Sequence, residues 1–384
     1  MARRRRWIVA VTTVLTLLAG VAIWSPWRKR ASLLHPASFR TPADEKWTLA
    51  ALLALKPPQI EGLDIALTNL LCAEGLRGSE KLDVVKTLDG LDDMATRVQV
   101  ETERNLHRFR SKPAEYENSE AYYRMLMLVT VLQQDFGIRY NPERVAPVGV
   151  FEPNEKFFAD SRDVFLHGLV GETKTGTCSS LPVLYTAVGR RLKYPLSLVS
   201  AKNHLFLRWE DQETRLNIEA TSLGMTHYDD AYYRKWPYPM TALEEKENGF
   251  LKSMTATAEC AVFLSIRGQC LMAAGRSEEA VSAHEQAARH APDAKLYQII
   301  LAIARRKADE FAAPELPGVG MPPDPSLWDM PEEMAWMLWN KDQAQRQQNQ
   351  LPGGLPDPMP RVPSPGRPFD QKKNYGLPSS SPDR

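Results

Sequence analysis

The sequence predicts an α+β fold in which one apolar helix packs on a small antiparallel sheet. An all-helical layer precedes this core, and a helical-repeat appendage follows it. Two observations support the prediction. Apolar residues at helical spacing follow Cys178 as far as Leu192. Three segments of strand character come next, at 196–201, 204–209 and 214–220, and the last two are joined by a short polar turn.

Residues 1–30 have the pattern of a membrane anchor. Arginines 3–6 precede an uncharged run of eighteen residues, 7–24, and basic residues 28–30 follow it. That length is near the minimum for one membrane-spanning helix and exceeds an ordinary signal-peptide core. We expect an uncleaved, single-pass signal anchor with a cytoplasmic N-terminus, which places the bulk of the chain outside the cytoplasm. A cleaved export signal is the open alternative.

A helical region, 41–150, precedes the core. Its apolar residues recur at helical spacing in several stretches. Ser119 and Gly137 have the residue types that begin and end helices, so a helix is expected over 119–136. Another short helix is expected to begin at Ser161. Together these helices are predicted to form a layer on the core.

A thiol, an imidazole and a carboxylate are predicted to lie close together in the core. Cys178 follows a Gly-Thr turn at the start of the apolar helix, where unpaired backbone N–H groups favour a thiolate and can hold an oxyanion. His204 and Glu219 lie on the second and third predicted strands. If Trp209 pairs with Thr214, then His204 lies directly opposite Glu219, close enough for the carboxylate to orient the imidazole.

These three residue types are the components of a thiol-nucleophile site. Each also has a structural interpretation, because free cysteines are commonly buried apolar residues and strand histidines are commonly satisfied core residues. The shared register favours the catalytic interpretation. A disulfide between Cys178 and another cysteine stays open, with Cys72, Cys260 or Cys270 as the partner. No pair of cysteines or histidines has the close spacing of a zinc site, so we expect no metal and no cofactor.

With these residues placed, the stretch 160–224 resembles the transglutaminase-like superfamily of papain-fold thiol enzymes. The resemblance rests on a Gly-x-Cys that opens a helix, a histidine on a strand, and an acid fifteen residues after the histidine. It implies a papain/transglutaminase-like core with Cys178 as nucleophile, His204 as base and Glu219 in the place of the family's aspartate. Glutamate departs from the family's Cys-His-Asp pattern by one methylene.

A bacterial branch of the superfamily looks similar over roughly residues 60–300, with a helical region before the core and tetratricopeptide-like helices after it. Residues 261–294 fit one such unit, because Gly268 permits close helix packing and Gly275 separates two helices. A single unit cannot bury its own apolar face, so a further helix over 296–306 is expected to cap it.

Composition limits the classes of partner. The net charge of the 384 residues is +1, which argues against a general nucleic-acid binder. Of the 29 prolines, 15 lie in the final 74 residues, which predicts a largely disordered tail with at most a short helix over 331–343. The predicted order is a membrane anchor at 1–30, the helical region at 41–150, the core at 151–240, tetratricopeptide-like helices at 255–308 and the Pro-rich tail at 311–384.

The predicted function is acyl transfer at an amide of a protein or peptide substrate, by a membrane-anchored cysteine peptidase, amidase or acyltransferase. Hydrolysis of a peptide or isopeptide bond and transfer to an amine share one acyl-enzyme intermediate, so both stay open. The alternative is a catalytically silent scaffold that recruits protein partners at the membrane, through its C-terminal helices. An aromatic cluster after the core either lines a substrate cleft or packs against those helices; its members are Tyr228, Tyr232, Tyr233, Trp236 and Tyr238.

Overall fold

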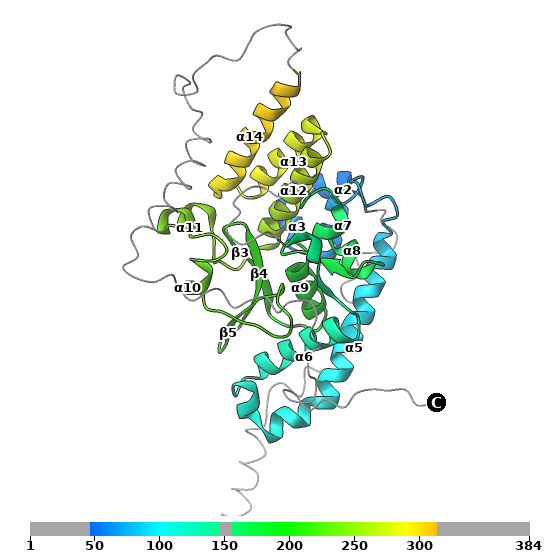
Figure 1. Ribbon diagram of the computed structural model, residues 1–384, viewed down its shortest axis with the longest axis vertical. Helices are drawn as coiled ribbons and strands as arrows, with labels where there is room; N and C mark the ends of the chain where they lie inside the picture. The colour runs from blue at the N-terminus through cyan, green and yellow to red at the C-terminus, as the bar shows by residue number, and fades with distance from the viewer. Residues whose placement is uncertain (1–46, 146–155, 313–384) are drawn as a thin grey trace, which may run out of the picture.

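The computed structural model describes residues 47–145 and 156–312. Within them the chain has a mixed α+β fold that is mostly helical and carries a three-stranded antiparallel sheet (Figure 1). The predicted anchor at 1–30 and the Pro-rich tail beyond residue 312, with its short helix, lie outside the described residues. In the described ranges, no helix combines the length and the apolar character that crossing a bilayer requires.

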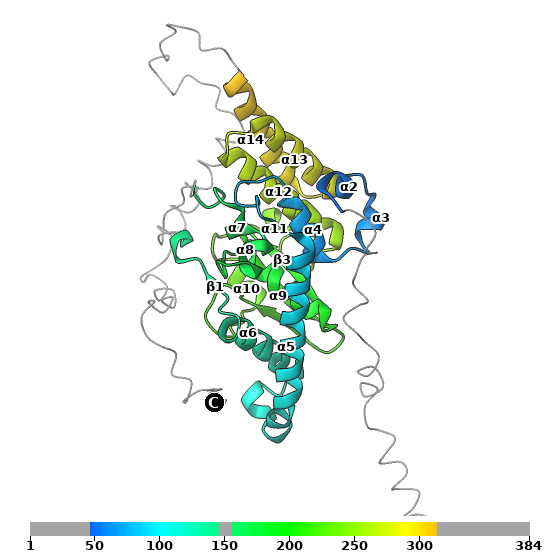
Figure 2. The ribbon, with the colours of Figure 1, turned by 90° about the vertical axis from the view of Figure 1, so that its right-hand side faces the viewer.

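The N-terminal layer is helical, as the apolar stripes predicted. It contains α2 (Leu49–Leu53), α3 (Pro57–Ile60), α4 (Ile65–Cys72), α5 (Val84–Ser111) and α6 (Glu120–Gln134), with the 3-10 helices η3 (Pro113–Tyr116) and η4 (Pro142–Arg144). The predicted helix start at Ser119 is confirmed, because its side chain accepts a hydrogen bond from the backbone N–H of Tyr122 in the first turn of α6. The long α5 runs down one side of the molecule, and α6 packs back against it (Figure 2).

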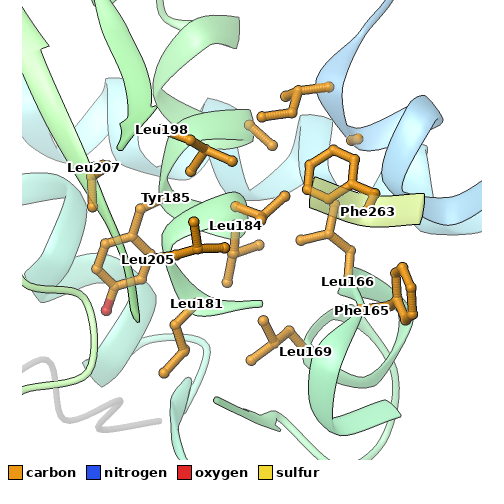
Figure 3. Close-up of a cluster of buried hydrophobic side chains, with 14 of the residues drawn as sticks. Phe165, Leu166, Leu169, Leu181, Leu184, Tyr185, Leu198, Leu205, Leu207 and Phe263 are labelled. Carbon is orange, nitrogen blue, oxygen red and sulfur yellow. The ribbon is translucent and has the colours of Figure 1, made fainter. Parts of the chain in front are cut away.

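Helix α9 (Leu181–Arg191) lies at the centre of the core. All of its residues except Arg190 are buried, so it contacts neighbours on every side. Each fully buried leucine in such a core contributes roughly 1.5–3 kcal/mol relative to an exposed one. Around α9, Figure 3 shows side chains from the sheet and from the segment of α7 (Ser161–Val164) and α8 (Leu166–Val170); those labelled are Leu198, Leu205, Leu207, Phe165, Leu166 and Leu169.

The strands of the described residues form two sheets. A parallel pair joins β1 (Arg139–Tyr140) and β2 (Thr175–Gly176), and the larger sheet has the order β3 (Leu196–Ala201), β4 (His204–Glu210) and β5 (Arg215–Ile218). The larger sheet corresponds to the three predicted strands. The parallel pair was not predicted, because two-residue strands carry no readable alternation of apolar and polar residues.

The predicted register between β4 and β5 is wrong by two residues. Trp209 pairs with Leu216 rather than with Thr214. The reason is the side chain of Asp211, which accepts hydrogen bonds from the backbone N–H groups of Glu213 (2.9 Å) and Thr214 (2.7 Å) and thereby builds the turn around itself. Since side chains alternate between faces, a shift of two residues leaves every side chain on its predicted face.

The C-terminal part consists of helices that follow the sheet. They are α10 (Asp230–Tyr233), α11 (Ala242–Asn248), α12 (Ala256–Ala273), α13 (Ser277–His290) and α14 (Lys295–Ala312). Gly268 permits the close packing of α12 on α13, because a Cβ there would lie 2.4 Å from Nε2 of His284. Gly275 follows α12 with a φ of +71°. Helix α14 extends past the predicted end at residue 306, through residues such as lysine and alanine that favour helix.

Two arginines fix the C-terminal end of α9 to three surrounding helices. Arg190 makes a bidentate pair with Glu259 of α12, at 2.9 and 2.6 Å. Arg191 binds Asp64, the N-cap residue of α4, at 2.6 Å and Asp92 of α5 at 2.7 Å. The Arg191 side chain is 4% exposed, so these pairs lie largely out of water. The arginines therefore set the position of the helix whose other end follows Cys178.

We expect Arg191→Ala to lower the free energy of unfolding by about 3–5 kcal/mol, because it leaves two carboxylates without their buried partner. Urea denaturation of the purified protein measures this loss. Lys112→Ala is the matched control: its pair with Glu115 is exposed, at 66% and 59%, and its removal should leave the free energy of unfolding nearly unchanged. Equal losses of stability in the two variants would contradict the stabilising role of the buried Arg191 pairs.

Candidate active site

Cys178 lies in the turn between β2 and α9. Gly176 has no room for a side chain before this turn, since a Cβ would lie 2.4 Å from Oγ of Ser180. The carbonyl of Thr177 accepts hydrogen bonds from the N–H groups of Ser180 (3.1 Å) and Leu181 (3.0 Å), which winds the chain into the helix. The N–H of Cys178 takes part in neither bond, and its side chain is partly exposed. The thiol therefore lies at an accessible point just before the helix.

Asp163 holds the turn in place from the neighbouring segment. Its main-chain carbonyl accepts hydrogen bonds from Oγ of Ser180 (2.8 Å) and Oγ1 of Thr177 (3.1 Å). Its carboxylate accepts hydrogen bonds from Nδ2 of Asn141 (2.7 Å) and Nε of Arg144 (2.8 Å). One aspartate therefore joins the cysteine turn to the chain that follows β1.

His204 and Glu219 form a buried pair at the end of the sheet. Nε2 of His204 lies 2.8 Å from Oε2 of Glu219, and the two side chains are 4% and 2% exposed. Glu219 directly follows the end of β5, and continuing the observed register by one residue sets it opposite Phe206, diagonally across from His204 rather than directly opposite. Diagonal neighbours are separated by roughly 7–8 Å, which the longer glutamate side chain helps to bridge.

The Glu219 carboxylate is fully supplied with hydrogen-bond donors. Oε1 accepts from the backbone N–H of Thr221 (2.9 Å) and from its hydroxyl (2.5 Å). Oε2 accepts from His204 and from the hydroxyl of Tyr233 (3.2 Å). Burial alone would raise the pKa of Glu219, but the charge of His204 and the hydrogen bonds from His204 and Thr221 lower it below its ordinary value. The buried group is therefore a carboxylate.

His204 links this carboxylate to the thiol. Burial alone would lower the pKa of His204, but the charge of Glu219 and the hydrogen bonds to Cys178 and Glu219 raise it to about 10. Because Nε2 faces Glu219, Nδ1 is the nitrogen that remains for Cys178. The structure thus brings together all three residues that the sequence singled out, in the order thiol, imidazole, carboxylate.

Aromatic side chains cover the imidazole. The ring of Trp236 meets the ring of His204 edge to face, with centroids 4.6 Å apart. Tyr233 stacks on Phe206, with ring centroids 3.8 Å apart, and Phe206 lies two residues after His204 on β4. Four members of the aromatic cluster, Tyr228, Tyr232, Tyr233 and Trp236, pack on this sheet face together with Leu296 of α14. The packing interpretation of the cluster is therefore right, and Trp236 contacts the candidate site in addition.

The remaining cysteines and His167 lie apart from this chemistry. All four cysteines are free thiols, so the disulfide that the sequence left open for Cys178 is not formed. Burial lowers the pKa of His167 to about 4, and Nε2 of its ring lies 3.2 Å from Oγ of Ser161, which indicates a structural role for this histidine. Among residues 47–145 and 156–312, no cluster of histidine, cysteine, aspartate or glutamate has the arrangement of a metal site.

Sequence reasoning missed three contributors to the site. Thr221 lies two residues after Glu219, and that spacing is a usable signal because short hydroxyl side chains often bond to groups two residues away. Tyr233 was seen only as part of an aromatic cluster. Tyr140 pairs with Gly176 across β1 and β2; burial raises its pKa, and interactions with Cys178 and Glu219 raise it further. No local pattern predicts that contact.

A thiol at a helix start, next to an imidazole that is paired with a carboxylate, is an arrangement found in the thiol enzymes of acyl transfer. Residues 86–258, from α5 to the start of α12, match the family model of the transglutaminase-like superfamily. This part of the chain is a transglutaminase-like domain. Such a domain points to thiol amidase or acyltransferase activity, and enzymes of this kind act on protein or peptide substrates.

The match does not extend over α13 and α14, so the tetratricopeptide-like assignment of the C-terminal helices stays a prediction. The boundaries given above for the five segments of the chain also stay predictions. Comparisons with curated proteins and with solved structures gave no significant match.

We expect Glu219→Gln to lower the pKa of His204 from about 10 toward its ordinary value of 6.5, because the neutral amide no longer stabilises the imidazolium. NMR titration of the imidazole measures the change, and Glu213→Gln on the exposed hairpin turn is the matched control. A wild-type His204 that titrates near 6.5 would contradict the electrostatic account.

The same shift has a consequence for stability. A histidine whose pKa is higher in the folded than in the unfolded state stabilises the fold fully below about pH 6.5, and this contribution is lost as the pH rises through about 10. In Glu219→Gln the dependence of stability on pH over this window should therefore become flatter.

Proposed function

We propose that the protein is a thiol-dependent amidase or acyltransferase that acts on amide groups of proteins or peptides. Cys178 is the nucleophile, His204 transfers the proton and Glu219 orients His204 and stabilises its charged form. The observation that carries the proposal is the chain of contacts from Cys178 to His204 and, at 2.8 Å, from His204 to Glu219, in a transglutaminase-like domain.

In the first half of the proposed reaction, the Cys178 sulfur attacks the amide carbonyl carbon and forms a tetrahedral intermediate. The backbone N–H of Cys178, at the start of the turn into α9, supports a role as a donor to the developing oxyanion. His204 then gives its proton to the leaving nitrogen as the carbon–nitrogen bond breaks. The products are a free amine and a thioester on Cys178.

In the second half, a water molecule or a primary amine attacks the thioester carbonyl. His204 takes the proton from the attacking group, and the carbon–sulfur bond breaks to release a carboxylic acid or a new amide. Both outcomes use the same residues, so the geometry supports both.

Glutamate in the place of the family's aspartate is compatible with this proposal. The observed register sets Glu219 diagonally across from His204, so the added methylene compensates for a longer gap. Donors to both carboxylate oxygens hold the longer side chain in one orientation, which offsets its greater conformational freedom. The departure from the family pattern therefore does not argue against an active site.

Activity of the purified full chain tests the proposal. With fluorescently labelled casein as the amide substrate and a dansylated primary amine as acceptor, we expect cleavage of casein, incorporation of the amine, or both. Cys178→Ala should reduce the rate at least about 10³-fold, because it removes the proposed nucleophile. Cys270→Ala is the matched control, since that thiol is buried and only 5% exposed.

The catalytically silent scaffold is the other outcome of this test. It predicts no turnover of either reagent and an iodoacetamide reaction at Cys178 whose dependence on pH is the same in wild type and in His204→Ala. An active site predicts that His204→Ala changes that dependence, because the imidazole and the thiol exchange a proton. Turnover that survives in Cys178→Ala would exclude the proposed nucleophile.

We also propose that the segment 7–24 anchors the protein in a membrane, with the transglutaminase-like domain outside the cytoplasm. The proposal rests on the uncharged run and its flanking basic residues. The full chain should stay in the membrane fraction after an alkaline carbonate wash and should keep its original N-terminus in mass spectra. A soluble chain that begins after residue 24 would favour the cleaved export signal instead.

A further inference from the structure

Tyr233 shares one carboxylate oxygen with His204. Its hydroxyl donates to Oε2 of Glu219 at 3.2 Å, and Nε2 of His204 donates to the same atom at 2.8 Å. Tyr233 is fully buried, and its ring is fixed by a parallel stack on Phe206 with an interplanar angle of 5°. The hydroxyl therefore reaches Glu219 from a rigid position.

The helix that carries Tyr233 is itself clamped to the sheet. Asp230, the first residue of α10, accepts hydrogen bonds from Arg208 (2.7 Å), Arg215 (2.9 Å) and Asn217 (2.9 Å). Arg208 is 1% exposed and also donates to the carbonyl of Leu251 at 3.0 Å. Because the two sheet strands hold the start of α10, the tyrosine three residues later keeps its place above Glu219.

We propose that Tyr233 is a positioning residue of the site: its hydroxyl holds the Glu219 carboxylate beside His204 and, by donating to the same oxygen, limits how strongly that carboxylate stabilises the imidazolium. The inference rests on the proposed function, since it concerns the same Cys178 and His204 pair. Under this inference, α10 and the contacts of Asp230 that hold it on the sheet help to set the reactivity of the Cys178 thiol.

Few other titratable groups lie around the Glu219 carboxylate. Those that interact with Glu219 are His204 of β4, Tyr140 of β1, Tyr185 of α9 and Tyr232 of α10, and Cys178 interacts with His204. The tyrosines are neutral at ordinary pH, because burial raises the pKa of each. The ion pair of Arg208 with Asp230 lies further along the same sheet face. Tyr233 and Thr221 are thus the neutral donors that stabilise the carboxylate directly.

Removal of the hydroxyl has a defined direction. In Tyr233→Phe, Oε2 of Glu219 has His204 as its remaining side-chain donor, so the negative charge acts more strongly on the imidazolium. His204 then keeps its proton to a higher pH. A purely structural tyrosine would leave the titration of His204 in place and change only stability.

The experiment is the rate of iodoacetamide alkylation of Cys178 in the full chain as a function of pH, read by mass spectrometry of the Cys178 peptide. In this profile, the step at higher pH marks the loss of the proton from His204, and it is called the upper step below. We expect the pH of the upper step to rise by about 0.5–1 unit in Tyr233→Phe. Tyr228→Phe is the matched control: it removes the same atom from a ring of the same cluster, and its profile should equal that of wild type.

A second variant keeps the inference testable if Tyr233→Phe folds poorly. Replacement of Tyr233 by 3-fluorotyrosine keeps the ring and the hydroxyl but makes the hydroxyl a stronger donor, so the upper step should shift downward. Opposite shifts in the two variants support the inference. An upper step that stays in place in both variants, or that moves in the same direction in both, overturns it.

Failure of this inference is distinguishable from failure of the proposed function. His204→Ala is measured in the same series, and under the proposed function it abolishes the upper step. If His204→Ala leaves the profile unchanged, the pairing of Cys178 with His204 is wrong and the proposed function fails with it. If His204→Ala abolishes the step while the two Tyr233 variants do not move it, only the role of Tyr233 is wrong.

Discussion

A carboxylate on a side chain that is 2% exposed cannot remain charged inside a protein unless several donors replace the water it has lost. Glu219 meets this requirement through Thr221, Tyr233 and His204, and its charge in turn keeps the imidazole of His204 protonated. The rest of the site depends on this pair. Without it, His204 would be a buried neutral ring.

Two separate sets of contacts hold the two sides of the site, one at the nucleophile Cys178 and one at the acid Glu219. The nucleophile side is set by α9, which Arg190 and Arg191 tie to helices of the N-terminal and C-terminal layers. The acid side is set by α10, which Asp230 ties to the sheet. Both connections use buried or partly buried ion pairs, whose directionality specifies a single arrangement more sharply than apolar contact does. The N-terminal helices and α12 thus contribute to the site by holding α9.

The sequence predicted the helix after Cys178, the three strands and the face on which His204 and Glu219 lie, because these follow from local periodicity and from alternation along a strand. The register was wrong, since the side chain of Asp211 decides where the turn forms and periodicity does not record it. The contributions of Tyr233 and Tyr140 were not predictable either. Each depends on packing between segments distant along the chain, and no spacing rule connects Tyr233 to Glu219 before the fold is known.

The most direct test of the central claim is a double-mutant cycle on the alkylation rate of Cys178 at about pH 8, where an ordinary imidazole is neutral. The four proteins are wild type, His204→Ala, Glu219→Gln and the variant with both changes. If Glu219 acts through His204, the double variant reacts at the same rate as His204→Ala, since the acid has nothing left to orient. Effects that simply multiply would show that the two residues act on the thiol separately and would contradict the account.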